Sequence, residues 1–259
     1  METNLMGRTV VITGGSGALG SAIARRFAGE GVAAIALVDY DHDATVSAAS
    51  ALAAEPRPAE FAAIEVVPVV IDVTDHDAVQ SAYAGLTDRF GRIDVAINNA
   101  GVVAPSARIH NVRVEDFRRV LDVNLVGVFN CLKAAIIAMR ADGQGGSIVN
   151  TASVGGFTTW THSSPYGASK AAVIQLTKLA AAEYAVDRIR VNCVSPGTFV
   201  TQFHDDLPPG ALDDIRDRHP LGRFGTTAEI AQAYVYLCSE AAGWVTGSNL
   251  VVDGGMAIG

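Results

Sequence analysis

The chain alternates short apolar runs with longer stretches of mixed polarity. The apolar runs are rich in Val and Ile, which is typical of buried strands. We expect strands at 9–13, 33–38, 65–71, 93–97, 146–152, 189–194 and 249–252. The stretches between them carry Ala-rich or amphipathic patterns that predict helices, for example over 22–30, 43–54 and 168–183.

This alternation defines the expected fold class. Strands that alternate with helices favour right-handed crossovers, which build a parallel sheet covered by helices on both faces. The chain has 259 residues, of which 49% are hydrophobic, so it can bury a large core. Since no internal repeat, linker or low-complexity segment interrupts the pattern, we expect one α/β domain over residues 1–259, with a doubly wound sheet of seven mainly parallel strands.

Two stretches depart from the alternation. Residues 112–139 form one long helix or two, with Asn124 inside an otherwise apolar segment. Asn is a poor residue for a helix interior, and a buried amide bonded to the backbone would explain it. Between 198 and 223, apolar residues are scattered among acids, prolines and glycines, so we expect a substrate loop or lid there.

Composition excludes several classes of function. The net charge of -8, with no Lys/Arg cluster, argues against a nucleic-acid partner. Cys131, Cys193 and Cys238 are far apart and have no metal-ligand spacing, which predicts reduced thiols and no metal site. The N-terminus has no targeting pattern, and we expect no segment of membrane-spanning length. These features together predict a cytoplasmic protein with no membrane partner.

A glycine-rich turn, residues 14–20, follows the first strand directly and precedes a helix. Glycines let a backbone approach a pyrophosphate closely, and a helix N-terminus offers free N–H groups to the anion. Taken alone, the motif also fits a plain tight turn. Asp39, at the end of the second strand, favours the first interpretation because an acid at this distance binds the adenosine ribose. Its carboxylate would repel a 2′-phosphate, and neither Ser16 nor Tyr40 supplies a cation, so we expect NAD rather than NADP.

A second candidate group lies further along the chain. Tyr166 and Lys170 are spaced i, i+4 near the start of a predicted helix, and Ser153 follows the strand at 146–152. The three side chains could converge on one bound atom. A phenol with a pKa of about 10 is a poor base at neutral pH, but a neighbouring cation lowers that pKa. By itself the Tyr/Lys pair is a weak signal, because such a pair is far more often an ordinary surface pattern of an amphipathic helix.

The fourth strand ends in a small polar turn, residues 98–101. Open α/β sheets bind ligands at the carboxyl ends of their strands. The amides of Asn98 and Asn99 could therefore contact a cofactor or stabilise the end of the strand. For Asn98, the structural role explains the residue at least as well as the cofactor contact does.

Taken in order, these motifs resemble the short-chain dehydrogenase/reductase family from end to end. The resemblance is carried by Thr13-Gly14-x-x-x-Ala18-x-Gly20, Asp72-Val73, Asn98-Asn-Ala-Gly101, Asn124, Ser153, Tyr166-x-x-x-Lys170 and Pro196-Gly197. One departure is Ala18, where the family commonly has a glycine. The methyl group there would crowd the pyrophosphate turn, and we expect the neighbouring Gly17 to compensate for it. The resemblance implies a Rossmann-type fold.

The resemblance also implies roles for particular residues. Tyr166 would be the acid/base on the substrate oxygen, and Ser153 would hydrogen-bond that oxygen. Lys170 would hold the nicotinamide ribose and acidify Tyr166, while Asn124 would position a water. The implied cofactor-binding residues are Gly14, Ser16, Gly17, Leu19, Gly20, Asp39, Asp72, Val73, Asn99, Gly101, Tyr166, Lys170, Phe199 and Thr201.

We therefore expect an NAD-dependent oxidoreductase that transfers a hydride between a small secondary alcohol, or its ketone, and the nicotinamide. Ser153, Trp160 and Phe203 are the candidate substrate contacts, and the aromatic residues suggest an apolar, cyclic substrate. Two alternatives stay open: a 3-oxoacyl reductase or 3-hydroxyacyl dehydrogenase of the same fold, and a non-catalytic NAD-sensing protein. The family resemblance further suggests a homotetramer, and the helix after Pro165 and the C-terminal residues 256–258 are candidates for the contact.

Overall fold

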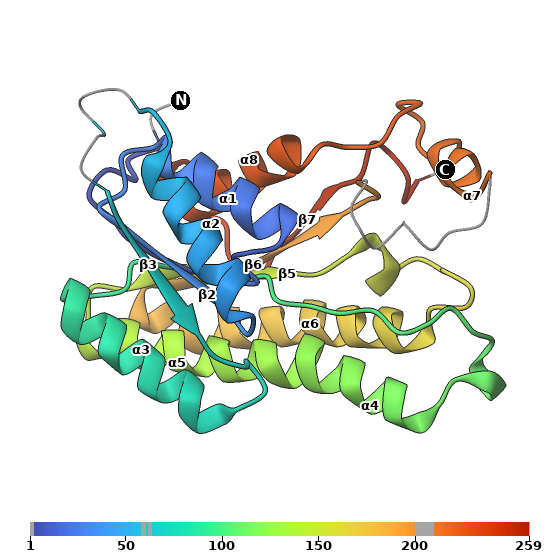
Figure 1. The fold of residues 1–259 in the computed structure, drawn as a ribbon, viewed down its shortest axis with the longest axis horizontal. Helices are drawn as coiled ribbons and strands as arrows, with labels where there is room; N and C mark the ends of the chain where they lie inside the picture. Colours follow the sequence, from blue (N-terminus) through green and yellow to red (C-terminus); the bar gives the residue numbers. More distant parts are fainter. Residues whose placement is uncertain (1–2, 58–60, 62–63, 200–209, 259) are drawn as a thin grey trace.

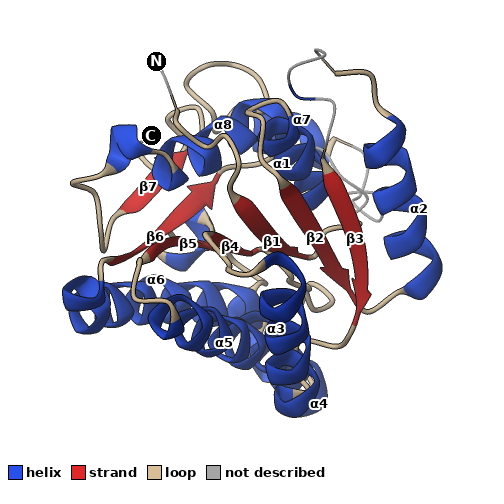
Figure 2. Ribbon diagram, turned by 90° about the vertical axis from the view of Figure 1, so that its left-hand side faces the viewer, coloured by secondary structure: helices blue, strands red, loops and turns tan. Residues whose placement is uncertain are grey.

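The computed structural model describes residues 3–57, 61, 64–199 and 210–258, which form one seven-stranded sheet between two layers of helices (Figures 1 and 2). Every neighbouring pair of strands is parallel, and the order is β3-β2-β1-β4-β5-β6-β7. The strands are β1 (Thr9–Thr13), β2 (Ala34–Asp39), β3 (Glu65–Val70), β4 (Val95–Asn98), β5 (Gly146–Thr151), β6 (Ile189–Pro196) and β7 (Asn249–Val252). The predicted doubly wound α/β fold is confirmed.

Helices cover both faces of the sheet (Figure 2). One layer holds α1 (Ala18–Ala28), α2 (His42–Ala54) and α8 (Thr227–Cys238). The other holds α3 (His76–Phe90), α4 (Val114–Leu121), α5 (Val128–Ala141) and α6 (Ser164–Tyr184). A short helix, α7 (Ala211–Arg216), lies beyond β6.

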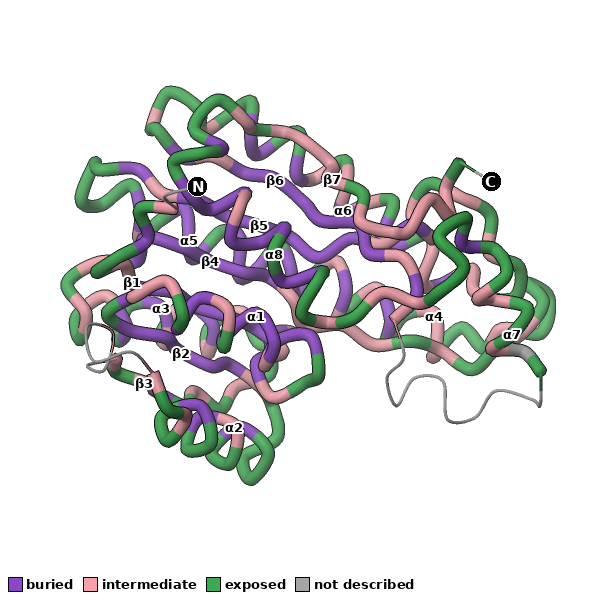
Figure 3. The backbone as a smooth tube through the Cα atoms, turned by 90° about the horizontal axis from the view of Figure 1, so that it is seen from above, coloured by how far each residue is buried: buried purple, intermediate pink, exposed green. Residues whose placement is uncertain are grey.

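The central strands are largely apolar because their residues are buried between the two helical layers (Figure 3). On β1, Val10 and Ile12 belong to the core shared with α1 and α8, whereas Val11 belongs to the core on the opposite face. All three side chains are fully buried. A strand with two buried faces therefore loses the polar alternation that would mark a solvent-facing side.

The direction in which successive strands are added reverses between β1 and β4. After β1, the chain adds β2 and β3 on one side of the sheet; β4 to β7 are then added on the other side of β1. At such a switch point, the connections leave the sheet in opposite directions and open a crevice at the carboxyl ends of the strands. The glycine turn follows β1 and the polar turn 98–101 closes β4. The fold therefore brings these two motifs to one edge.

Helices α4 and α5 are continuous through a π-helical turn, Asp122–Gly127. The resulting helix, Val114–Ala141, has 28 residues and is apolar enough to cross a membrane by length and composition. The expectation that no segment reaches this length was wrong. Since 56% of its most apolar window is buried inside the protein, packing against the sheet and α3 accounts for its composition.

One local expectation needs correction. Residues 198–223 are not wholly irregular, because α7 forms within them. Helix α3 is capped by Asp75, whose carboxylate accepts from the Ala78 N–H. Ser163 occupies the N-cap of α6, and among the described residues its side chain makes no capping hydrogen bond; Pro165 lies in the first turn of that helix.

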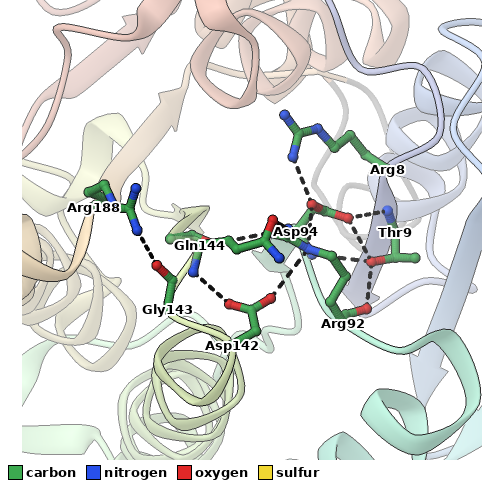
Figure 4. Close-up of polar contacts among 9 residues, drawn as sticks. Arg8, Thr9, Arg92, Asp94, Asp142, Gly143, Gln144 and Arg188 are labelled. Atoms are coloured by element: carbon green, nitrogen blue, oxygen red, sulfur yellow. Dashed lines mark hydrogen bonds and ion pairs between the residues drawn. The ribbon is translucent and has the colours of Figure 1, made fainter.

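An ionic network joins β1 to β4 at the amino edge of the sheet, away from the crevice (Figure 4). The Asp94 carboxylate, only 5% exposed, accepts hydrogen bonds from the backbone N–H and the hydroxyl of Thr9. It also pairs with the guanidinium groups of Arg8 and Arg92 at 2.9 and 2.8 Å. This network fixes the relative position of the strands on either side of the switch point.

Candidate active site

The glycine turn is shaped by contacts that exclude side chains. Gly14 has a φ of +64°, and a Cβ added at Gly20 would lie 2.0 Å from the Gly14 carbonyl oxygen. Gly17 is the N-cap of α1, and Ala18 is the exposed first residue of that helix. The Ala18 methyl group is therefore accommodated in the first helical turn, and the departure from the family pattern does not prevent the turn from forming. Leu19, by contrast, packs its side chain into the core.

Asp39 ends β2 beside this turn. Its Oδ2 accepts hydrogen bonds from the Ser16 backbone N–H at 3.1 Å and from the Ser16 hydroxyl at 2.5 Å. Its Oδ1 accepts only from the Tyr40 N–H among the described residues. The carboxylate thus both braces the turn and keeps lone pairs available for a ligand hydroxyl.

The residues expected around the adenine lie after β3. Asp72 is exposed, and its Oδ1 accepts from the N–H and the hydroxyl of Thr74, each at 2.8 Å. Val73 is buried against Gly127, where an added Cβ would lie 2.6 Å from a Val73 methyl carbon. Asp72 is thereby held at the surface of the crevice, while Val73 packs on the π-helical turn.

The two asparagines after β4 have different surroundings. Asn98 is buried and donates to the Asn150 side chain on β5 at 2.8 Å, which supports the structural role considered for it. Asn99 donates from Nδ2 to the Gly14 carbonyl oxygen at 3.2 Å. Asn99 therefore contacts the glycine turn itself.

Ser153 and Tyr166 meet beyond the carboxyl end of β5. The Ser153 Oγ accepts from the Gly155 N–H at 3.1 Å, and a Cβ added at Gly155 would touch both Ser153 and the Tyr166 ring. A hydrogen bond with Ser153 favours ionisation of the Tyr166 phenol, but burial has the larger effect and raises the pKa of Tyr166 above its ordinary value. The phenol is therefore held in its protonated form at neutral pH.

Lys170 is almost completely buried, at 2% exposure. Its Nζ donates to the Thr151 carbonyl oxygen at 2.8 Å and lies 5.6 Å from the centre of the Tyr166 ring. Burial lowers the pKa of Lys170 to about 8. We expected the Lys170 charge to lower the pKa of Tyr166, but the net shift of Tyr166 is upward because desolvation of the phenolate dominates.

Asn124 lies in the π-helical turn with its side chain fully buried. Its Oδ1 accepts from the Val102 N–H at 2.7 Å, and its Nδ2 donates to the Val102 carbonyl oxygen at 2.9 Å. A third hydrogen bond joins Nδ2 to the Ser169 hydroxyl at 3.1 Å. Backbone bonding thus explains a polar residue inside this helix, and the π turn aims the amide at the β4 loop.

Gly101 connects this amide with Lys170. A Cβ added at Gly101 would lie 3.3 Å from the Asn124 Oδ1 and 3.5 Å from the Lys170 Nζ. Asn124 and Lys170 are therefore near neighbours, and Lys170 lies under the Tyr166 ring that contacts Ser153. The structure brings the four candidate catalytic residues into one cluster, while their catalytic roles remain predictions.

The substrate side is described in part. Trp160 is half-buried, and the Arg218 guanidinium carbon lies 5.6 Å from its ring centre. Phe199 forms a bridge with Gly225 and packs on the core. The candidates Thr201 and Phe203 lie outside the described residues.

Sequence reasoning missed three polar residues at this edge: Thr151, Ser169 and Tyr234. Thr151 and Ser169 are buried and bond to Lys170 and Asn124, respectively. The Tyr234 hydroxyl lies 2.8 Å from the Thr151 hydroxyl. Polar side chains inside an apolar strand or helix were the available signal, but the sequence does not reveal what each one bonds.

Comparison with known proteins agrees with this geometry. A family model described as "Enoyl-(Acyl carrier protein) reductase" matches residues 15–257. The 3-oxoacyl-[acyl-carrier-protein] reductase of Thermotoga maritima is 38% identical over 98% of this chain and 99% of its own length. The cis-4-hydroxycyclohexanecarboxylate dehydrogenase of Sinomonas cyclohexanicum is also 38% identical, over 96% of each protein.

A solved structure of NAD+-bound xylitol dehydrogenase superposes with a TM-score of 0.89 at 32% identity, over 97% of this chain and all of the other. The chain therefore belongs to the short-chain dehydrogenase/reductase family, as the motifs indicated. It is an oxidoreductase, and its relatives indicate a nicotinamide cofactor.

Proposed function

We propose that this protein is an NAD-dependent dehydrogenase/reductase that interconverts a secondary alcohol and its ketone. The observation that carries the proposal is the cluster of Ser153, Tyr166 and Lys170 at the same sheet edge as the glycine turn and Asp39. Packing alone gives no reason to gather a phenol, a hydroxyl and a buried ammonium beside a dinucleotide-binding turn.

The chain's own residues can donate the proton to the substrate oxygen and accept it back. The bound nicotinamide would supply or accept the hydride. Tyr166, kept protonated by burial, would donate a proton to the carbonyl oxygen during reduction and become the phenolate. In the oxidation direction the phenolate form of Tyr166 would accept the proton of the alcohol hydroxyl. Ser153 would hydrogen-bond the same oxygen, and Lys170 would hold the ribose hydroxyls while remaining anchored on Thr151.

The preference for NAD is inferred from Asp39. Its Oδ1 is available to a ribose hydroxyl, whereas a 2′-phosphate would meet a carboxylate. Tyr40 is 75% exposed next to it, and the Asp41 carboxylate caps α2. The side chains around this position are acidic or neutral, and this disfavours the 2′-phosphate of NADP.

A ring-bearing substrate is the class we favour. Trp160 offers a half-buried aromatic surface near the start of α6, six residues before Tyr166. The name of the Sinomonas relative specifies a cyclohexane ring that carries a secondary hydroxyl.

The Thermotoga relative keeps a second candidate open, a 3-oxoacyl reductase that acts on a carrier protein. An acidic carrier protein requires a basic docking surface. We consider the segments 141–145 and 186–188 as candidates for this surface, and neither is basic. Arg188 bonds the Gly143 carbonyl oxygen, and Arg140, just before the first segment, pairs with Asp187. We therefore place the free small molecule ahead of the carrier-bound substrate, and a non-catalytic NAD sensor last.

The test is an assay of NAD reduction with a panel of secondary alcohols, cyclic diols, hydroxysteroids and 3-hydroxyacyl thioesters. Turnover of a cyclic secondary alcohol with NAD would support the proposal. Turnover restricted to thioesters would favour the second candidate. NAD binding without turnover of any alcohol or ketone would favour the sensor.

We also propose that the protein acts in the cytoplasm as a homotetramer. On the candidate helix α6, the apolar stripe at helical spacing is Val173, Leu176, Thr177, Ala180 and Ala181; all but the partly buried Leu176 are buried inside the subunit. The outer surface of α5 offers an alternative, since Val126, Phe129 and Ile137 are 43–53% exposed there or in the adjoining π turn.

A further inference from the structure

Thr151, the last residue of β5, makes hydrogen bonds toward both faces of the sheet. Its carbonyl oxygen accepts from Lys170 on α6, at 2.8 Å. Its hydroxyl lies 2.8 Å from the hydroxyl of Tyr234, which belongs to α8 in the opposite layer. The same Thr151 hydroxyl donates to the Asn99 Oδ1 at 3.3 Å. One residue thus connects both helical layers with the polar turn that follows β4.

The direction of these hydrogen bonds follows from counting protons. A threonine hydroxyl has one hydrogen, and Thr151 uses it toward Asn99, so Tyr234 must donate to Thr151. Asn99 then directs its carbonyl oxygen toward Thr151 and its amide nitrogen toward the Gly14 carbonyl oxygen, at 3.2 Å. The chain of donors runs from Tyr234 through Thr151 and Asn99 to Gly14.

Every member of this chain is held in place. Tyr234 is fully buried, and burial raises the pKa of its phenol, so the hydroxyl stays a donor. Thr151 is 8% exposed. At Gly14, an added Cβ would lie 2.9 Å from the Asn99 amide nitrogen, so the Asn99 side chain lies directly against the glycine turn. A connected polar network in a dry interior is rigid and orients its last member.

We propose that Tyr234 is a positioning residue for the cofactor, which fixes the glycine turn through Thr151 and Asn99. This inference rests on the proposed nicotinamide-dependent function. It gives a fully buried hydroxyl on α8 a role in dinucleotide affinity without any contact to the reacting atoms.

The experiment titrates NADH into the full-length protein and follows cofactor fluorescence. Tyr234→Phe keeps the ring and removes only the donor. We expect its dissociation constant for NADH to rise about fivefold, the scale of one lost hydrogen bond. At saturating NAD its kcat should stay within about twofold of wild type, because Tyr166 and Ser153 are untouched.

A second variant separates positioning from simple stability. Thr151→Val combined with Tyr234→Phe removes both hydroxyls and leaves no unpaired partner between them, so the melting temperature should recover toward wild type. NADH affinity should not recover, because the double variant also removes the Thr151 hydroxyl that donates to Asn99. Tyr83→Phe is the matched control: Tyr83 is 2% exposed on α3, and its hydroxyl has no partner among the described residues.

The outcomes are distinct. The inference is overturned if Tyr234→Phe binds NADH as wild type does, if Tyr83→Phe loses as much affinity, or if affinity follows the melting temperature back up in the double variant. Wild-type protein that binds neither NADH nor NADPH would overturn the proposed function, and this inference with it.

Discussion

The Lys170 ammonium donates to the backbone carbonyl oxygen of Thr151 at 2.8 Å, which ties the long α6 helix to the carboxyl end of β5. This bond holds a cation in a nearly dry position, where its pKa falls to about 8. The charge of Lys170 therefore changes within the working range of pH. One kinetic consequence follows from this placement.

Ketone reduction should decline as the pH rises through about 8. Below that value Lys170 is charged and the Tyr166 phenol, whose pKa is raised, is protonated, so both groups are in the form that reduction needs. Above it the ammonium is lost. The measurement is kcat/KM for reduction against pH. Lys170→Met should lower the rate throughout and remove the decline near 8. A decline that persists unchanged in Lys170→Met would show that another group titrates.

Cofactor choice should depend on Asp39. We expect kcat/KM with NAD to exceed that with NADP by at least about tenfold, or about 1.4 kcal/mol. Replacing Asp39 by Ser and Tyr40 by Arg should narrow the gap, because a repulsive carboxylate is exchanged for a cation. Steady-state kinetics with both cofactors provide the measurement. Equal use of both cofactors by the wild-type enzyme would refute the assignment.

Asp94 should contribute strongly to stability. Asp94→Asn removes a buried charge that faces Arg8 and Arg92, so the free energy of unfolding should fall by about 2–3 kcal/mol. Asp142→Asn is the control, because Asp142 is 22% exposed and lies 3.5 Å from Arg92. Chemical denaturation at pH 7 measures both. Equal losses in the two variants would argue against a special role for Asp94.

Assembly should involve the outer surface of α5. We expect light scattering to give the molecular mass of a tetramer. Phe129→Glu should lower this mass, because it places a charge in an apolar contact between subunits and so weakens the assembly. Phe129 is 46% exposed within the subunit, so the substitution should leave the monomer fold intact. Circular dichroism checks the fold. A wild-type monomer would contradict the proposal.

The sequence predicted the fold and the candidate cluster well, for identifiable reasons. Strands such as β1 are buried on both faces and keep an apolar pattern, and the Tyr166 and Lys170 spacing survives because α6 is regular. The π-helical turn around Asn124 was not predicted, since it depends on a tertiary bond to Val102. The upward shift of the Tyr166 pKa was not predicted either, because burial cannot be read from spacing.

The central claim is that Tyr166 moves the proton. Tyr166→Phe retains the ring and removes only the ionisable oxygen, so it isolates this step. The most direct measurement compares kcat of this variant and of wild type with one competent alcohol, together with NADH affinity by fluorescence. We predict that turnover falls at least about a hundredfold while NADH affinity stays within about twofold. A variant that keeps most of its turnover would contradict the account.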